Sequence, residues 1–288
     1  MKERLYKPSV MREVLTRHGF HFSKSLGQNF LIDGTVLDQI AQGADLNEED
    51  AVLEVGPGIG VLTQVLCEHA GHVVAVEIDK ALLPVLDETL ESYKNVEVVS
   101  GDILKLNLPA LFEEKFAGEQ VKVVANLPYY ITTPIIMNFF EQKLPVERIV
   151  VMVQKEVADR MQAKPSTKAY GTLSIAVQYY AEAKVVTIVP SGAFFPPPNV
   201  DSAVIALVRR DKPAVDVKDE KFFFKVVKAA FAQRRKTLPN TLSSTMGISK
   251  DLIRQALEKA EIDSKRRGES LTLTEFGRLS DCLGEVVE

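Results

Sequence analysis

Cysteine and long apolar runs are scarce in this chain of 288 residues, and each scarcity excludes a class of protein. The two cysteines, Cys67 and Cys282, have no spacing typical of a metal site, and so few thiols indicate a reducing compartment. No stretch approaches the ~20 apolar residues of a membrane span, and the N-terminus lacks an apolar signal-peptide segment. We therefore expect a cytoplasmic protein without a metal site or membrane contact.

The charge of the chain is unevenly distributed. The net charge is −4, yet residues 1–24 carry six Lys and Arg against two Glu, and residues 209–288 carry 17 cations against 13 acids. The segment between them carries 12 cations against 24 acids. This asymmetry favours an acidic, nucleotide-binding centre with basic flanks that contact nucleic acid, although excesses of this size also arise by chance.

Short apolar runs alternate with helix-length segments through the first two thirds of the chain. The runs predict strands at 51–56, 72–78, 96–100, 121–126 and 148–154. Strands joined by helices predict a parallel sheet covered on both faces, which is an α/β fold. Two later strands, 185–189 and 203–209, are joined by a Pro-rich loop, so we expect an antiparallel addition at one edge.

The pattern breaks between 209 and 220, where charged residues and a proline cluster. Beyond this break the periodicity is helical, with helices expected at 221–233, 238–246, 249–260 and 273–286. We therefore predict a basic N-terminal segment at 1–24, an α/β domain at 25–208 and a small all-helical domain at 209–288.

A glycine-rich turn follows the first predicted strand, with Glu54 ahead of Gly56 and Gly58. Glycines let a ligand approach the backbone closely because no Cβ blocks it. Glu77 and Asp102 end the next two strands. A carboxylate at the first position suits ribose hydroxyls, and one at the second suits an adenine amino group. The expected cofactor site also includes Ile78 and Ile103, which directly follow these acids.

Two cofactors fit such a turn. Nicotinamide dinucleotides prefer G-x-G-x-x-G, whereas the spacing here is G-x-G-x-G, and Glu54 would repel a pyrophosphate. The same carboxylate favours the cationic amino-acid end of S-adenosylmethionine. Polar Gln28 and Asn29, placed between apolar neighbours, are expected to close over that end.

The segment Asn126-Leu127-Pro128-Tyr129 ends the strand expected at 121–126, at the edge where open α/β sheets bind ligands. The Asn126 Oδ and the Leu127 carbonyl offer two acceptors, and Tyr129 offers a flat face for a base. This set suits an exocyclic amino group on a planar ring. The alternative interpretation is an ordinary strand exit with Tyr129 as a half-buried wall.

Together these motifs resemble the ribosomal RNA adenine N6,N6-dimethyltransferases, specifically the bacterial small-subunit branch. The resemblance covers essentially the whole chain and implies a Rossmann-like class I S-adenosylmethionine-dependent methyltransferase sheet with a helical tail. The matching segments are SLGQNFL (25–31), EVGPGIG (54–60), VEID (76–79), GDIL (101–104), NLPYYITTP (126–134), FFPPPNVDS (194–202), QRRKTL (233–238) and RGESL (267–271).

The resemblance implies a role for each matching residue. It implies that S-adenosylmethionine contacts Gln28, Asn29, Leu31, Gly56, Glu77, Asp102 and Asn126. It implies that the pocket for the target adenine consists of Asn126, Leu127, Tyr129 and Phe194. The implied substrate is a pair of adjacent adenosines in a hairpin loop near the 3′ end of small-subunit rRNA, within an assembling subunit. Departures from the family pattern occur at Tyr130, Phe195, Asn199 and Pro239.

Two basic triplets in the tail are candidate phosphate contacts, which give register rather than sequence recognition. They are Arg234, Arg235 and Lys236, followed by Lys265, Arg266 and Arg267. The alternative is a solvated helix face. The expected protein is a monomer that binds rRNA.

The expected reaction is direct transfer of the sulfonium methyl to adenine N6, with the target base flipped out of its stack. Tyr129 and Phe194 would sandwich the flipped base. Four other classes stay open: a nicotinamide-dependent oxidoreductase, a large-subunit rRNA dimethyltransferase of the antibiotic-resistance branch, a methyltransferase-like RNA-binding assembly factor, and a DNA adenine methyltransferase. The last usually carries a second proline where Leu127 stands.

Overall fold

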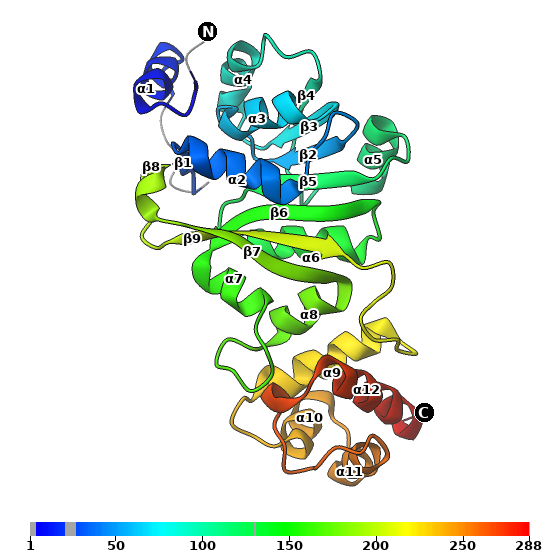
Figure 1. Ribbon diagram of the computed structural model, residues 1–288. Coiled ribbons are helices and arrows are strands. Elements are labelled where there is room, and N and C mark those ends of the chain that lie inside the picture. The colour runs from blue at the N-terminus through cyan, green and yellow to red at the C-terminus, as the bar shows by residue number, and fades with distance from the viewer. Residues whose placement is uncertain (1–3, 21–26, 130, 288) are drawn as a thin grey trace. The chain divides into compact units, whose positions relative to one another are not determined.

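The computed structural model describes residues 4–20, 27–129 and 131–287 (Figure 1). Parts of the expected N-terminal segment, 1–3 and 21–24, lie outside the described residues, as do Ser25, Leu26 and Tyr130. The chain divides into two compact units. The first comprises Met1–Ala158 with Lys184–Arg209, and the second comprises Asp159–Ala183 with Arg210–Glu288. One crossing between the units therefore lies at the break in the sequence pattern.

A seven-stranded sheet has the strand order β4-β3-β2-β5-β6-β9-β7. Neighbouring strands from β4 to β6 in that order are parallel, whereas β9 runs antiparallel to β6. This arrangement confirms the expected parallel core with an antiparallel addition at one edge. The strands are β2 (Ala51–Val55), β3 (His72–Glu77), β4 (Val96–Ser100), β5 (Val121–Asn126), β6 (Val146–Gln154), β7 (Ala181–Val189) and β9 (Ser202–Arg209).

The central strands are apolar and buried, as coverage on both faces requires. All residues of β2 are buried, and in β5 only the last residue, Asn126, is partly exposed. The register places Glu54 of β2 beside Ala75 of β3 and Val124 of β5. The carboxyl ends of these three strands therefore meet at one edge of the sheet.

Helices follow the strands on both faces. Helix α2 (Gly34–Ala44) packs against β5, β6 and β9 and crosses in front of the sheet in Figure 1. It begins at Asp33, whose carboxylate accepts hydrogen bonds from two backbone N–H groups of the first turn. The other helices of this part are α1 (Pro8–Arg17), α3 (Val61–His69), α4 (Leu83–Thr89), α5 (Leu108–Phe116) and α6 (Thr132–Glu141). Helix α7 (Lys155–Met161) begins in the first unit and ends in the second.

A two-stranded antiparallel ribbon joins two motifs that are far apart in the sequence. Strand β1 (Phe30–Leu31) pairs with β8 (Phe194–Phe195), so that Phe30 faces Phe195 and Leu31 faces Phe194. The ribbon belongs to the buried core of the first unit. It fixes the segment that precedes α2 beside the Pro-rich loop.

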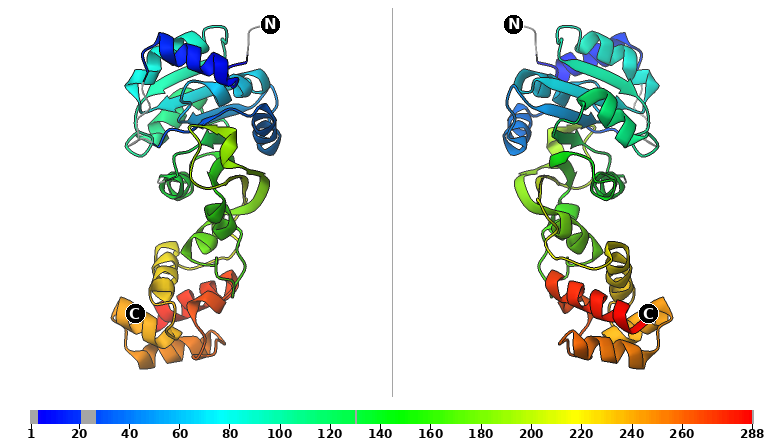
Figure 2. Two further views of the ribbon diagram at one scale, coloured as in Figure 1. Left: turned by 90° about the vertical axis from the view of Figure 1, so that its left-hand side faces the viewer. Right: turned by 90° about the vertical axis from the view of Figure 1, so that its right-hand side faces the viewer.

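The second unit contains α8 (Thr172–Tyr180), α9 (Glu220–Ala232), α10 (Leu238–Met246), α11 (Lys250–Lys259) and α12 (Leu273–Val287). Its core includes Phe223 and Phe276, and the Tyr179 ring stacks on Phe223 with centroids 5.1 Å apart. Both views in Figure 2 show helices in the yellow-to-red part, and no strand lies within residues 210–287. None of the helices within the described ranges is long and apolar enough to cross a membrane.

Candidate active site

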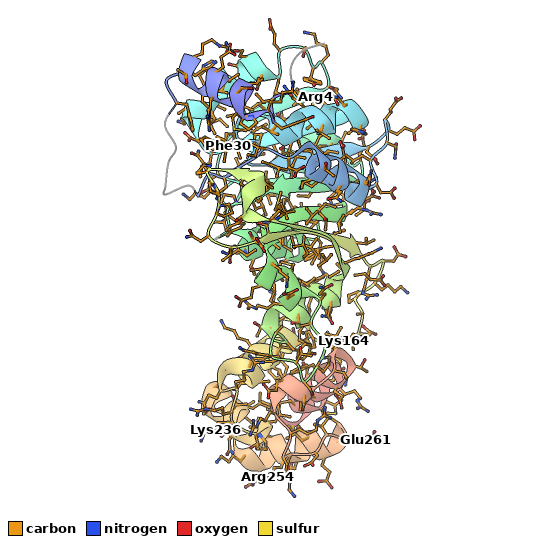
Figure 3. The ribbon with its side chains drawn as sticks, turned by 60° about the vertical axis from the view of Figure 1, so that its left-hand side comes forward. Arg4, Phe30, Lys164, Lys236, Arg254 and Glu261 are labelled. Carbon is orange, nitrogen blue, oxygen red and sulfur yellow. The ribbon has the colours of Figure 1, made fainter. Side chains whose placement is uncertain are left out.

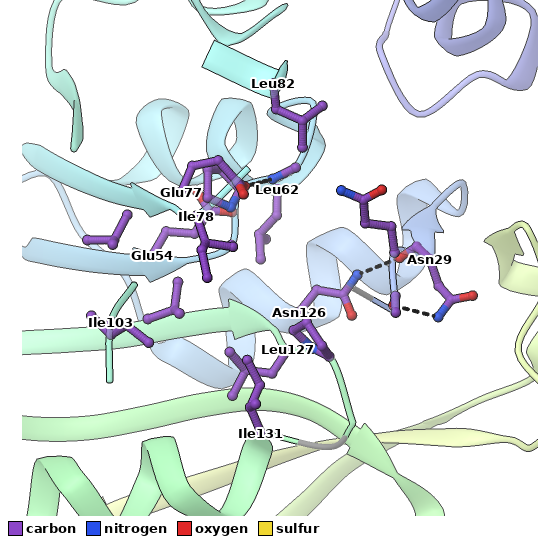
Figure 4. A pocket seen from close by; sticks show the side chains of 18 of the residues that line it. Asn29, Glu54, Leu62, Glu77, Ile78, Leu82, Ile103, Asn126, Leu127 and Ile131 are labelled. Carbon is purple, nitrogen blue, oxygen red and sulfur yellow. Dashed lines mark hydrogen bonds between the residues drawn. The ribbon is translucent and has the colours of Figure 1, made fainter. Parts of the chain in front are cut away.

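A pocket opens at the carboxyl ends of β2, β3, β4 and β5, in the first unit (Figure 4). The space within it, with the open solvent at its mouth included, is about 1060 Å³. Thirteen of the fourteen residues predicted for cofactor and base line this one pocket. They are Gln28, Asn29, Leu31, Glu54, Gly56, Gly58, Glu77, Ile78, Asp102, Ile103, Asn126, Leu127 and Tyr129.

The glycine turn forms the floor of the pocket beside β2. Gly56, Gly58 and Gly60 have φ angles of 71°, 63° and 93°, in the left-handed region that favours glycine. A Cβ at Gly58 would lie 2.8 Å from the ring of Phe30, so a larger residue at this position would also clash sterically. The backbone N–H of Gly58 donates to Glu77 Oε2 at 3.1 Å, which ties the turn to the end of β3.

Glu77 is held rigidly at the end of β3. Its Oε1 accepts a hydrogen bond from the Asp79 N–H at 2.7 Å, while Oε2 accepts from the glycine turn. The side chain is buried, and this burial raises the pKa of the carboxyl. A carboxylate fixed between the turn and the strand exit suits a pair of ribose hydroxyls.

Glu54 is a buried acid without a hydrogen-bond partner for one oxygen. The residue is 1% exposed, and its Oε2 makes no hydrogen bond within the described structure. Burial raises the pKa of Glu54 to about 8, and the nearby charge of Glu77 acts in the same direction. An orphaned carboxyl oxygen that lines a pocket is a place for a cationic group such as an ammonium. The residues present therefore fit the amino-acid end of S-adenosylmethionine.

Asp102, Ile78 and Ile103 line the other end of the pocket. Asp102 Oδ1 accepts a hydrogen bond from the Leu104 N–H at 3.1 Å, so the loop after β4 holds this carboxylate. Ile78 is 50% exposed, whereas Ile103 is buried. Two apolar side chains and an acceptor at this end suit a purine ring with an amino group.

Gln28 and Asn29 line the pocket and are hydrogen-bonded to other residues there. Gln28 Nε2 donates to Asp79 Oδ2 at 2.8 Å. Asn126 Nδ2 donates to the Asn29 carbonyl at 3.1 Å, and Asn29 Nδ2 donates to the Gly27 carbonyl at 3.0 Å (Figure 4). Because the Asn126 amide donates on the side of Asn29, its oxygen is free to accept on the other side.

Tyr129 and Phe194 occupy different environments. The Tyr129 hydroxyl shares a hydrogen bond of 2.6 Å with the hydroxyl of buried Ser202, at the start of β9. Burial also raises the pKa of Tyr129. Phe194 does not line the pocket: it is 3% exposed and packs in the core opposite Leu31. Its pairing with β1 holds Phe194 in the core, and the role of this ring in stacking the target base stays a prediction.

The two basic triplets of the tail are divided by the structure. Arg234 pairs with Glu269 at 2.7 Å and also donates to the Lys168 carbonyl. Arg266 binds both carboxylate oxygens of Glu275, at 2.5 and 3.1 Å, and holds the pKa of that carboxyl down at about 2. These two arginines stabilise the fold of the helical unit. The side chains of the remaining four are exposed and make no hydrogen bond or ion pair with another described residue: Arg235, Lys236, Lys265 and Arg267.

Several functional neighbours were not predicted. Ser202 and Asp79 hold Tyr129 and Gln28, and both lie in motifs that the sequence already singled out, FFPPPNVDS and VEID. Phe30 and Ile131 add apolar walls and also lie in quoted motifs, SLGQNFL and NLPYYITTP. Leu62 and Leu82 add two more, and nothing local in the sequence distinguishes these two from core residues. Among the residues that the structure describes, no cluster of three or more His, Cys, Asp or Glu side chains is arranged to hold a metal ion.

The sheet order, the glycine turn and the pocket above it define a Rossmann-like class I methyltransferase whose cofactor is S-adenosylmethionine. The family model described as ribosomal RNA adenine dimethylase matches residues 19–279. This chain belongs to that family, as the motifs predicted. The nicotinamide alternative is thereby set aside.

Curated relatives are similar in sequence to this chain over essentially its full length. The chain is 54% identical over 284 residues to the ribosomal RNA small subunit methyltransferase A of Alkaliphilus oremlandii, covering 98% of this chain and 99% of that protein. It is 55% identical over 291 residues to the protein of the same name from Bacillus licheniformis, covering 100% of both. These relatives confirm the predicted resemblance to the small-subunit branch.

Two solved structures share the fold. A dimethyladenosine transferase from Plasmodium falciparum is 26% identical with a TM-score of 0.73, covering 87% of this chain and 95% of that one. The 23S rRNA methyltransferase ErmE is 28% identical with a TM-score of 0.67, covering 89% of this chain and 100% of that one. The likeness to both supports the class I sheet with a helical C-terminal region.

Proposed function

We propose that this protein dimethylates N6 of two adjacent adenosines in the hairpin loop near the 3′ end of small-subunit rRNA. The observation that carries the proposal is the amide of Asn126, which the Asn29 carbonyl orients beside a pocket suited to S-adenosylmethionine. The relatives at 54% and 55% identity, named as small-subunit methyltransferases, support the choice of rRNA.

The cofactor is held by the residues at the strand ends. Glu77 binds the ribose hydroxyls, Asp102 accepts from the adenine amino group, and Glu54 receives the ammonium of the amino-acid end. Ile78 and Ile103 hold the purine between them, while Gln28 and Asn29 cover the amino-acid end. When bound, S-adenosylmethionine supplies a methyl group on a positively charged sulfur, which needs no further activation by the protein.

The target amine is aimed by two acceptors. Asn126 Oδ and the Leu127 carbonyl accept the two N6 hydrogens, which localises the nitrogen lone pair and directs it into the pocket. Methyl transfer leaves N6 positively charged and acidic, so its proton passes to water and no strong base is required. Catalysis by these residues is therefore positioning and electrostatic stabilisation.

The base must leave its stack to reach this corner. Extrusion costs a few kcal/mol, and stacking on an aromatic ring returns ~1–3 kcal/mol per base. Tyr129 presents such a ring, fixed through its hydroxyl by Ser202. Phe194 completes the sandwich only if the ribbon of β1 and β8 opens to release its ring.

The remaining parts of the proposal concern the partner. Exposed Arg235, Lys236, Lys265 and Arg267 bind rRNA phosphates, and the helical region binds the subunit. The protein acts as a monomer on an assembling small subunit, in the bacterial cytoplasm where such subunits are made. The basic N-terminal segment adds further phosphate contacts.

Methyl incorporation into undermethylated small subunits tests the proposal. We expect wild-type protein to place four methyl groups on two adjacent adenosines, mapped by nuclease digestion and mass spectrometry. Asn126→Ala should lower kcat by roughly 10²-fold or more, by analogy with the loss of one stabilising donor elsewhere. Asn47→Ala, at an exposed turn, is the control and should retain full activity.

Three outcomes would contradict the proposal. Near-wild-type turnover by Asn126→Ala would remove the proposed orientation of the amine. Modification of large-subunit rRNA in preference to small-subunit rRNA would favour the antibiotic-resistance branch. Binding of subunits by wild-type protein without methyl transfer would favour an assembly factor.

A further inference from the structure

The segment from residue 221 to residue 250 contains seven Lys and Arg and no Asp or Glu. The chain as a whole has a net charge of −4, so the positive charge of this stretch is opposite in sign to that of the whole chain. Three of the seven cations precede the basic triplet of the loop after α9, and they lie on α9 itself. These three are Lys221, Lys225 and Lys228.

Helical geometry places the three lysines in one line. Their spacing is i, i+4 and i+7, so they share a face of α9 over about 10 Å. All three are exposed. The opposite face packs into the helical unit through Phe223, Val226, Val227, Ala229 and Ala230. The exposed row of Lys221, Lys225 and Lys228 is called the α9 lysine stripe below.

The stripe works against helix stability. Like charges at i and i+4 destabilise a helix by roughly 0.2–0.5 kcal/mol per pair, and an ordinary solvated helix face alternates its signs to avoid this. Helix α11 of the same unit follows the ordinary rule, since Arg254 pairs with Asp251 at 3.0 Å and Lys259 pairs with Glu285. The side chains of the stripe have no such partner among the described residues.

We propose that the α9 lysine stripe binds the phosphate backbone of rRNA and extends the phosphate-binding surface of Arg235 and Lys236. The inference rests on the proposed function, because it assumes an rRNA partner. Lysine suits this task as a flexible point charge that needs no fixed geometry. The stripe supplies affinity and register, and it reads no sequence.

The composition of this face favours a nucleic acid over an acidic protein. Protein interfaces are depleted in lysine and depend on buried aromatic anchors. The aromatic residues Phe223 and Phe224 of α9 instead stack against Tyr179 and Tyr180 within the unit. What the helix leaves exposed alongside the lysines is Ala232, which offers no anchor. In Figure 3, Lys236 at the end of this basic segment lies on the opposite side of the unit from Glu261.

A matched pair of triple variants tests the stripe in the full-length protein. The test variant is Lys221→Gln with Lys225→Gln and Lys228→Gln, and glutamine keeps a good helix propensity. The control is Lys218→Gln with Arg254→Gln and Lys259→Gln, which removes the same charge from cations already paired with carboxylates. Affinity for undermethylated small subunits and for a protein-free 3′ fragment of small-subunit rRNA is measured over a series of salt concentrations.

We expect the test variant to bind both partners roughly 10- to 100-fold more weakly at about 0.1 M salt, with a salt slope lower by about 2 to 3. The control should stay within about twofold of wild type. Cofactor affinity of the test variant should be unchanged, and its Tm should equal or slightly exceed that of wild type because the repulsion between the lysines is removed, which excludes misfolding as the cause.

Two results would overturn the inference: equal loss in both triple variants, or loss of binding to subunits but not to protein-free rRNA. The second result would assign the stripe to a ribosomal protein. If instead wild-type protein binds rRNA yet modifies no adenosine, the proposed function fails. The salt series still shows whether the α9 lysine stripe binds rRNA phosphates. If the triple lysine variant binds rRNA as wild type does while Asn126→Ala abolishes methyl transfer, the proposal for the α9 lysine stripe fails and the proposed function stands.

Discussion

At the residue scale, the site consists of side chains that are held in place by hydrogen bonds to backbone groups and to other side chains. Asn126 is oriented by a carbonyl, Glu77 by two backbone N–H groups, and Tyr129 by Ser202. Such partners hold each side chain in one direction, as the proposed selectivity for one amine requires. Two predictions concern single residues of this kind.

The first concerns the hydrogen bond between Tyr129 and Ser202. Ser202→Ala leaves the Tyr129 ring free to move and removes a buried bond, which should cost about 1–2 kcal/mol of stability. We expect kcat for methyl transfer to fall about 10-fold while cofactor affinity stays constant. Tyr129→Phe should act alike, and the double variant should show no further loss, since both changes remove one interaction. Additive losses in steady-state kinetics would contradict a shared bond.

The second concerns Glu54, whose pKa burial raises to about 8 from the ordinary 4.5. The cofactor-free fold therefore keeps a proton that the unfolded chain releases. This contribution to stability is complete below the unfolded pKa and is lost as pH rises through the folded one. Glu77, whose pKa burial also raises, acts in the same direction.

Thermal unfolding without cofactor should therefore show a smaller loss of stability for Glu54→Gln than for wild type between about pH 5 and about pH 8. The variant keeps the neutral form at every pH. It should also bind S-adenosylmethionine more weakly, because it no longer offers a negative charge to the ammonium. Glu49→Gln, at an exposed turn, should behave as wild type. Parallel pH profiles for wild type and Glu54→Gln would show that Glu54 is charged in the free protein.

At the element scale, the glycine turn between β2 and α3 is the feature on which the pocket depends most. Gly58→Ala meets both a φ of 63° and the Phe30 ring at 2.8 Å. We expect it to destabilise the protein by about 1–3 kcal/mol and to weaken cofactor binding, measured by thermal unfolding and calorimetry. Gly192→Ala has open space at its Cβ and is the matched control. Equal behaviour of the two variants would remove the proposed role of the turn.

Elements with strong periodicity could be predicted from the sequence, and weakly patterned ones could not. The parallel strands that end at Val55, Glu77 and Asn126 are predominantly apolar runs, so their positions and the pocket beyond them could be predicted. Helix α5 and the ribbon of β1 and β8 were not predicted from the sequence pattern. The ribbon has two residues per strand and depends on pairing between segments more than 160 residues apart, which no local pattern reveals.

The same limit explains which site residues could be assigned. Thirteen residues at strand ends and turns fell into one pocket because backbone topology alone brings strand ends together. Phe194 does not line this pocket, because its backbone pairs with Leu31 in the ribbon of β1 and β8. Nothing in the sequence distinguishes Arg234 and Arg266 from the neighbouring cations. Their partners are Glu269 in η4 (Gly268–Ser270) and Glu275 in α12, so only the folded structure shows that they are paired.

At the scale of the whole molecule, the sequence separates an acidic central segment from basic flanks. Acidic residues dominate the central segment that contains the cofactor pocket, and the acid-free stretch from 221 to 250 lies in the helical unit. A carboxylate-lined pocket attracts a cationic cofactor, whereas a basic surface attracts phosphates. The modest net charge of −4 is the sum of an acidic central segment and two basic flanks.

A crystal structure of the protein with bound S-adenosylmethionine tests the central claim most directly. The account predicts the ribose on Glu77, the ammonium near Glu54, and the methyl carbon directed at the space beside Asn126 Oδ and the Leu127 carbonyl. A methyl group turned away from that amide, or a cofactor seated outside the glycine turn, would contradict it.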